Sequence, residues 1–112
     1  MNKLQNPHKA IIPLEKLSEY ALNPEHDEGK HKARVFKSAL GLTQNDAPFL
    51  QKVIQEIIFT HEAKHESSND YGERYVIDFE LTTSVGTAII RTAWIIRFSE
   101  DFPRLTTCYI VG

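Results

Sequence analysis

The amino-acid sequence predicts an α+β fold, in which two to three N-terminal helices pack on a C-terminal antiparallel sheet of three, or at most four, strands. Apolar residues recur at helical spacing up to about residue 58. From residue 74 onward they alternate with polar residues at a period of two. Short turns, rather than helices, separate these alternating segments, which is typical of an antiparallel sheet that follows a helical region.

Length, composition and charge limit the classes of protein that need to be considered. The chain has 112 residues, is 41% hydrophobic and 25% charged, and has a formal net charge of −2. This length suits one domain, so we expect a flexible polar arm over residues 1–10 and a single α+β domain over residues 11–112. The charge excludes a global positive field, so any site for an anion must be local.

Three helices are expected before the sheet. Pro13 suits the first turn of a short helix over residues 13–21. A second helix over residues 30–40 has a basic outer face and ends at Gly41. The third helix, over residues 48–58, has the clearest periodicity, with apolar residues at Phe49, Leu50, Val53, Ile54, Ile57 and Ile58.

The strands are expected after a polar interruption. Residues 61–70 lack apolar anchors and are interpreted as a frayed helix end that runs into a loop. Residues 74–82 alternate as a strand with one apolar face, whereas residues 87–98 are apolar on both faces, as a central strand should be. The loop at residues 84–86 makes a hairpin between them, and residues 104–111 form the last strand.

The single cysteine and the lack of long apolar runs bear on location. Because Cys108 is the only cysteine, the chain cannot form an internal disulfide. We expect Cys108 to be a buried, reduced thiol, which fits a reducing cytoplasm. The first residues have no apolar signal core, and no apolar run reaches the roughly 18 residues that span a bilayer. We therefore predict a cytoplasmic location and no membrane partner.

The string His61-Glu62-Ala63-Lys64-His65 matches the zinc-protease pattern H-E-x-x-H literally. That pattern needs both histidines on one helical turn, with a third ligand elsewhere. The charged side chain at position 64 and the polar residues that follow indicate solvent, and no histidine occurs after His65. We interpret the string as a solvated helix end and expect no metal site. A zinc hydrolase, with a carboxylate such as Glu80 or Glu100 as the third ligand, is the third-ranked alternative.

A cluster of cations on the second predicted helix is a candidate phosphate site. Lys30, Arg34 and Lys37 share one face, while His31 and Lys32 point to either side. One helix thus presents cations beside a titratable imidazole near its N-terminus, where anions bind well. The alternative is a solvated face whose cations form surface ion pairs with Asp27 or Glu28.

A second candidate lies on the predicted sheet. Arg91 sits in the most apolar strand, so it either pairs with an acid such as Asp78 or lines a cleft. On a regular last strand, Arg104 and Thr106 share one face, and Thr107 and Tyr109 share the other. These groups can supply cations and hydroxyls to one anion, although an ion-paired Arg91 among threonines that merely fill strand positions explains the pattern equally well.

Several motifs occur in an order that covers nearly the whole chain from residue 11. They are Ile12-Pro13-Leu14-Glu15-Lys16-Leu17, Gly29-Lys30-His31-Lys32-Ala33-Arg34-Val35-Phe36, Tyr71-Gly72-Glu73-Arg74-Tyr75-Val76-Ile77-Asp78, Arg91-Thr92-Ala93-Trp94-Ile95-Ile96 and Pro103-Arg104-Leu105-Thr106-Thr107. In these motifs the chain resembles a bacterial family known as domain of unknown function six-eight-eight-three. The layout of helices followed by an antiparallel sheet is also similar to the RelE, EndoU, colicin and barnase group of ribonuclease toxins, and family members look like toxin modules or phage-associated genes.

The resemblance implies a toxin-like, metal-independent endoribonuclease that cleaves RNA by 2′-OH transesterification without a cofactor. Such an enzyme needs an acid and a base, and cations that stabilise the charge of the phosphorane. Under this hypothesis the catalytic residues are His31, Lys32, Arg91, Arg104 and Tyr109. The substrate-binding residues are Lys30, Arg34, Tyr75, Thr92 and Thr107.

A different class of function is also compatible with the sequence. The chain is then a non-catalytic protein-binding module of a toxin–antitoxin or phage-related pair, with a partner on an exposed strand or helix face. The partners expected under the two hypotheses are RNA, and a cognate antitoxin or immunity protein. Dispersal of His31, Arg91 and Arg104 over separate surfaces would favour the second hypothesis.

Overall fold

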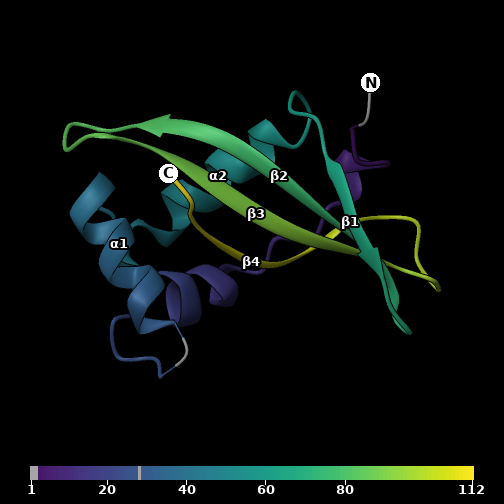
Figure 1. Ribbon diagram of the computed structural model, residues 1–112, viewed down its shortest axis with the longest axis horizontal. Helices are drawn as coiled ribbons and strands as arrows, with labels where there is room; N and C mark the ends of the chain where they lie inside the picture. The colour runs from purple at the N-terminus through teal and green to yellow at the C-terminus, as the bar shows by residue number, and fades with distance from the viewer. Residues whose placement is uncertain (1–2, 28) are drawn as a thin grey trace.

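The helices precede the sheet in the computed structural model, which describes residues 3–27 and 29–112 (Figure 1). A π-helical turn, η2 (Lys16–Ala21), is followed by α1 (Lys30–Leu40), by a short 3₁₀ turn, η3 (Gln44–Asp46), and by α2 (Ala47–Ile57). Another 3₁₀ turn, η1 (Pro7–Lys9), precedes them. The predicted α+β order is therefore confirmed.

The ends of α1 and α2 follow from their local sequences. Gly41 adopts a left-handed conformation with φ of 70° and ends α1, as its position predicted. Before α2, the Thr43 N–H donates to Asp46 Oδ2 at 2.8 Å in a capping box of η3, the 3₁₀ turn that leads into the helix. Leu50 and Ile54 of α2 are fully buried, so the periodic apolar face packs inward.

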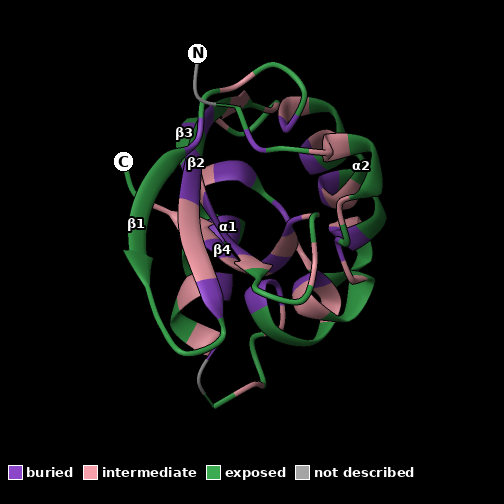
Figure 2. Ribbon diagram, turned by 90° about the vertical axis from the view of Figure 1, so that its right-hand side faces the viewer, coloured by how far each residue is buried: buried purple, intermediate pink, exposed green. Residues whose placement is uncertain are grey.

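Four antiparallel strands form one sheet in the order β1-β2-β3-β4. Their bounds are β1 (Lys64–Ser68), β2 (Gly72–Thr82), β3 (Thr87–Arg97) and β4 (Arg104–Ile110). The interpretation of residues 61–70 as a frayed helix end and loop was wrong, because β1 occupies residues 64–68. All five of its residues are exposed, so β1 is held by backbone pairing with β2 and carries no apolar pattern that sequence reasoning could detect (Figure 2).

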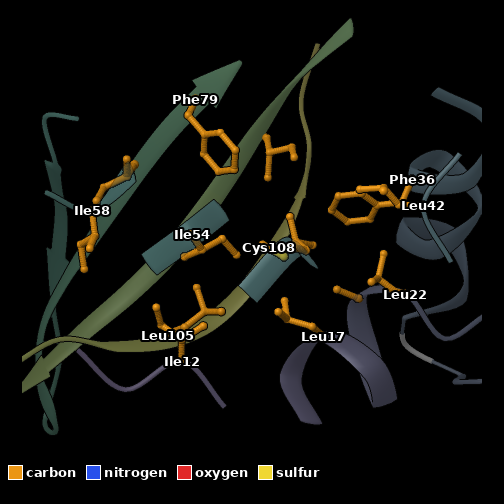
Figure 3. Close-up of a cluster of buried hydrophobic side chains, with 14 of the residues drawn as sticks. Ile12, Leu17, Leu22, Phe36, Leu42, Ile54, Ile58, Phe79, Leu105 and Cys108 are labelled. Atoms are coloured by element: carbon orange, nitrogen blue, oxygen red, sulfur yellow. The ribbon is translucent and has the colours of Figure 1, made fainter. Parts of the chain in front are cut away.

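The two faces of the sheet differ. The inner face carries Ile77, Phe79, Ile90, Trp94 and Leu105, which belong to the core cluster with the helices. Figure 3 shows part of this cluster, in which Leu17, Phe36 and Ile54 from the helical half surround Cys108 of β4. The alternate positions of β2 and β3 form the outer face, and Figure 2 shows that α2 lies on the side of the molecule opposite β1.

A β-bulge in β4 changes which side chains reach the outer face. Leu105 pairs with Trp94 and Thr107 pairs with Ala93, so Thr106 is an extra residue. Leu105 and Cys108 are both in the core although they are three residues apart, an odd spacing that a regular strand does not allow on one face. The predicted separation of Arg104 from Thr107 and Tyr109 was therefore wrong: the bulge brings all three to the outer face.

The segment before the helices is tied to the body of the protein. Leu4 is buried in the core, and the side chain of Asn6 donates to the Asp101 carbonyl oxygen at 2.6 Å. Ile11 bridges to Arg104 in parallel and so covers part of the β4 edge. The flexibility expected of residues 1–10 stays a prediction. Residues 1–2 of that arm, and Glu28, which was considered as an ion-pair partner, lie outside the described residues.

The overall dimensions suit the length of the chain. The radius of gyration is 13.6 Å, close to the value of about 13 Å that a compact chain of this length has. Within residues 3–27 and 29–112, none of the helices is long and apolar enough to cross a membrane.

Candidate anion-binding site

Three polar residues stand side by side across the outer face of the sheet. Asp78 of β2 lies opposite Arg91 of β3, and Arg91 lies opposite Tyr109 of β4. The Arg91 guanidinium donates to Asp78 through two parallel hydrogen bonds, from Nε to Oδ1 at 2.8 Å and from Nη2 to Oδ2 at 2.9 Å. The alternative that Arg91 pairs with Asp78 is therefore confirmed.

A lysine from α1 completes this group of side chains. Lys32 Nζ donates to Thr107 Oγ1 at 3.3 Å and lies 5.0 Å from the centroid of the Tyr109 ring. Its helix runs beside the β4 edge, which brings the ammonium group to side chains of the outer face. We call Lys32, Asp78, Arg91, Thr107 and Tyr109 the Tyr109 cluster.

The electrostatics of the cluster follow from these contacts. The Asp78 carboxylate raises the pKa of the Arg91 guanidinium above its ordinary value, and Tyr109 adds a smaller effect in the same direction. About a third of each side chain in the ion pair is exposed, so solvent screens the attraction and an incoming anion can compete with Asp78.

These side chains are chemically suited to an oxyanion such as phosphate. Lys32 is a compact point charge, whereas the planar guanidinium of Arg91 can donate two parallel hydrogen bonds to one anion. The hydroxyls of Thr107 and Tyr109 lie on the same stretch of β4 and can each donate one more hydrogen bond. Two cations and two hydroxyls thus converge on one patch.

His31 lies next to the cluster along α1. It is exposed and follows directly before Lys32 in the helix. Successive residues of a helix are turned by about 100°, so His31 and Lys32 lie on neighbouring faces of α1. The helix thus places an exposed imidazole one residue before the lysine of the cluster.

Arg104 is on the same face but distant from Arg91. It pairs with Ile95, four positions along β3 from Arg91, which corresponds to roughly 13 Å at the usual rise of a strand. Its guanidinium makes two hydrogen bonds to Glu100, at 2.8 and 2.7 Å, and lies over the Phe102 ring. Arg104 is therefore engaged elsewhere and is not brought together with the Tyr109 cluster.

Three further candidates lie in other places. Arg34 lines a hollow with Lys37 on the other flank of α1, and helical spacing puts Lys30 on that flank too. Tyr75 lies on the inner side of β2, where its ring packs edge-on against His65 at 5.3 Å between centroids. The structure does not bring Lys30 and Arg34 to the Tyr109 cluster. Tyr75 lines one hollow with Asp78 and Arg91, but its ring is engaged with His65.

Thr92 does not fit a substrate-binding role. It is completely buried, and its hydroxyl donates to the Ile77 carbonyl oxygen at 2.9 Å while it accepts from Trp94 Nε1 at 2.8 Å. The sequence could not reveal that Thr92 is buried. Alternation puts Thr92 and Arg91 on opposite faces of the sheet, but it does not show which face the helices cover.

The two histidines of the H-E-x-x-H string are not arranged as that motif requires. His61 follows the end of α2 and contacts Thr60, whereas His65 lies in β1 and faces Glu73 at 3.1 Å. The string therefore has no helical turn that would align both rings. Over residues 3–27 and 29–112, no group of three or more side chains of the metal-binding types is suitably placed.

The sequence did not single out a hollow at the ends of β2 and β3. Tyr71 and Phe98, at adjacent ends of β2 and β3, line one hollow together with Arg74 and Arg97. The sequence did contain a signal for this hollow. Tyr71 and Phe98 adjoin polar segments at the strand ends and do not belong to the alternating apolar positions that form the core, which indicates that their rings are exposed.

Comparisons with known proteins give one positive finding. Neither the curated proteins nor the solved structures include a match to this chain. A family model described as a domain of unknown function, DUF6883, matches residues 3–112. The match spans nearly the whole sheet and helical layer described above, and the chain therefore belongs to the DUF6883 family.

Proposed function

We propose that this protein is a toxin-like, metal-independent endoribonuclease that cleaves RNA by 2′-OH transesterification at the Tyr109 cluster. One observation carries the proposal: Lys32 of α1 contacts both Thr107 and Tyr109 of β4, and Arg91 of β3 lies opposite Tyr109 on the same face. A phosphodiester held there has a cation on either side, as the charge of a phosphorane requires.

The proposed reaction needs no group beyond this chain and RNA. His31 accepts the proton of the 2′-hydroxyl, whose oxygen attacks the adjacent phosphorus. The bond from phosphorus to the 5′-oxygen breaks, and Tyr109 protonates that leaving oxygen. The products are a 2′,3′-cyclic phosphate and a 5′-hydroxyl. Lys32 and Arg91 stabilise the negative charge that develops on the phosphoryl oxygens.

Cleavage of total RNA and tRNA by the purified protein in the presence of EDTA tests this proposal. We expect a 2′,3′-cyclic phosphate at the cleaved ends and no cleavage of DNA, which lacks the nucleophile. Lys32→Gln and Tyr109→Phe should each lower the rate by about a hundredfold, the usual effect of removing one group that stabilises charge or transfers a proton.

Lys37→Gln is the matched control, because Lys37 is exposed on the same helix but lines the hollow on the opposite flank. It should leave the rate unchanged. Absence of cleavage, or equally strong cleavage by a His31→Ala/Arg91→Ala double variant, would refute the ribonuclease proposal.

The non-catalytic protein-binding module remains a second candidate. The Asp78 carboxylate already neutralises Arg91 in a two-hydrogen-bond pair, an arrangement that serves an interaction surface as well as an enzyme. Stable complex formation with a cognate antitoxin or immunity protein by a chain that does not cleave RNA would favour this candidate. A cytoplasmic location is part of both proposals, and it accords with a buried free thiol at Cys108.

A further inference from the structure

A second hollow on the molecule carries exposed aromatic rings next to arginines. This hollow, which we call the Phe98 hollow, is lined by Asp70, Tyr71, Arg74, Ile95, Arg97 and Phe98 among others. Tyr71 is 74% exposed and Phe98 is 67% exposed, so both rings are largely in water. The Phe98 N–H donates to the Tyr71 carbonyl oxygen at 3.0 Å, which fixes the two residues side by side.

The outer face of β3 connects this hollow to the Tyr109 cluster. Arg91, Ala93, Ile95 and Arg97 alternate along β3, and the uninterrupted pairing with β2 keeps them on one face. Ala93 and Ile95, the two residues between the arginines on this face, are apolar and buried. The path from Arg91 to Arg97 is six residues, or about 20 Å.

The charge of this face differs from that of the chain as a whole. The chain has a net charge of −2. Along the outer face, its rims and the Phe98 hollow, six cations nevertheless outnumber four carboxylates, Asp70, Asp78, Glu80 and Glu100. These cations are Lys32, Lys64, Arg74, Arg91, Arg97 and Arg104.

We propose that the outer face binds single-stranded RNA along β3, and that the bases beyond the ends of β2 and β3 stack on Tyr71 and Phe98, a few nucleotides away from the phosphate at the Tyr109 cluster. This inference rests on the proposed ribonuclease function and names its substrate class. Exposed aromatic rings beside cations are the usual platform for unpaired bases, which offer an open π-face. Four-stranded antiparallel sheets in RNA-binding modules hold two or three bases on such a face, a scale that matches this path.

Unpaired RNA fits the hollow better than the two obvious competitors. The bases of a duplex are stacked on one another and leave no free face for Phe98. An apolar protein partner would bury Arg74 and Arg97 with one carboxylate of the hollow, Asp70, between them, because Glu100 near Arg97 already makes two closer hydrogen bonds to Arg104.

Binding of a fluorescent 2′-O-methyl RNA of about eight nucleotides, which cannot undergo transesterification, provides the test. A Tyr71→Ala/Phe98→Ala variant should raise its Kd about tenfold or more, the loss expected from removing base–aromatic stacking. Phe49→Ala is the matched control, because Phe49 is 47% exposed on α2, away from the outer face, and it should leave Kd unchanged.

A dinucleotide supplies the internal comparison. It spans one phosphate and should perturb the amide signals of the Tyr109 cluster with the same affinity in the wild type and in the Tyr71→Ala/Phe98→Ala variant. Circular dichroism verifies that each variant is folded, which the exposure of the two aromatic side chains leads us to expect.

The outcomes separate this inference from the proposed function. The inference is overturned if the wild type binds no octamer, or binds a duplex with equal affinity. It is also overturned if the Tyr71→Ala/Phe98→Ala variant keeps the wild-type affinity for the octamer, or if Phe49→Ala lowers that affinity as much. Octamer binding that depends on Phe98, in a protein that cleaves no natural RNA, supports the inference while the ribonuclease proposal fails.

Discussion

The Thr92 hydroxyl joins two strands and the only tryptophan of the chain inside the core. Replacing Thr92 with Val removes both hydrogen bonds and leaves the Trp94 indole N–H without its acceptor. We expect a loss of about 1–3 kcal/mol in the free energy of unfolding, the usual effect of an unsatisfied buried polar group. Urea denaturation measures it. Thr82→Val on the exposed end of β2 should change stability by less than about 0.5 kcal/mol, and an equally small effect at Thr92 would contradict the argument.

The ion pair between Glu100 and Arg104 predicts a dependence of stability on pH. The Arg104 guanidinium lowers the pKa of the Glu100 carboxyl below its ordinary value of 4.5. The folded state therefore prefers the ionised carboxylate. The contribution of the ion pair to the free energy of unfolding is complete above pH 4.5 and is lost as the pH falls through the folded-state pKa of Glu100.

Glu100→Gln tests this dependence by thermal denaturation over a range of pH. At neutral pH the wild type should have the higher Tm, and the difference should shrink as the pH falls below 4.5. Asp101→Asn, in the same turn but more exposed, is the control. A difference in Tm that stays constant across this range would show that Glu100 does not act through its charge.

Single residues also show where sequence reasoning succeeds and where it ends. The cost of burying a lone guanidinium pointed to Asp78 as a partner of Arg91, and the ion pair confirms it. The contact of Lys32 with Thr107 joins residues 75 positions apart, and no local pattern encodes which long-range pairs meet. We predicted that Arg34, Tyr75 and Thr92 belong to one site because of their side-chain types alone. The fold places these residues on different surfaces or in the core.

At the scale of elements, the end of α1 depends on a residue that tolerates a positive φ. Gly41→Ala should destabilise the protein by about 1–2 kcal/mol, because a Cβ is disfavoured in the left-handed region. The added atom would also lie 2.6 Å from Val85 Cγ2, so the hairpin side chain must move. Gly41→Asn should cost less, since asparagine visits this conformation more readily. Chemical denaturation that finds the two variants equally stable would contradict this explanation.

The elements that sequence reasoning recovered are those with a periodic apolar face. α1, α2, β2, β3 and β4 bury such a face, and their expected positions agree with the observed bounds to within about two residues, the usual spread at element ends. The strand β1 was missed because both of its sides are exposed. The bulge at Thr106 was missed because one extra residue leaves composition and turn signals unchanged, yet it reverses the faces on either side of it.

At the scale of the whole molecule, the cations gather on the outer face of a protein that is acidic overall. This distribution predicts that RNA binding depends on the salt concentration. For single strands, the logarithm of the binding constant falls with the logarithm of the salt concentration by about 0.7 for each neutralised phosphate. Contacts from about three cations therefore predict a slope near −2 for the 2′-O-methyl octamer. Anisotropy titrations at several salt concentrations measure this slope, and Arg97→Gln should reduce its magnitude by about 0.7. An affinity independent of salt would contradict an electrostatic contribution from this face.

The exposed strand β1 also bears on how the protein avoids self-association. Its outer backbone edge is a template on which the strand of another molecule could form hydrogen bonds, the first step towards aggregation. Lys64 places a charge at this edge, and the irregular pairing between His65 and Ser67 interrupts the straight ladder that an incoming strand needs. The polarity that hid β1 from sequence analysis is thus what makes an open sheet edge tolerable at high protein concentration.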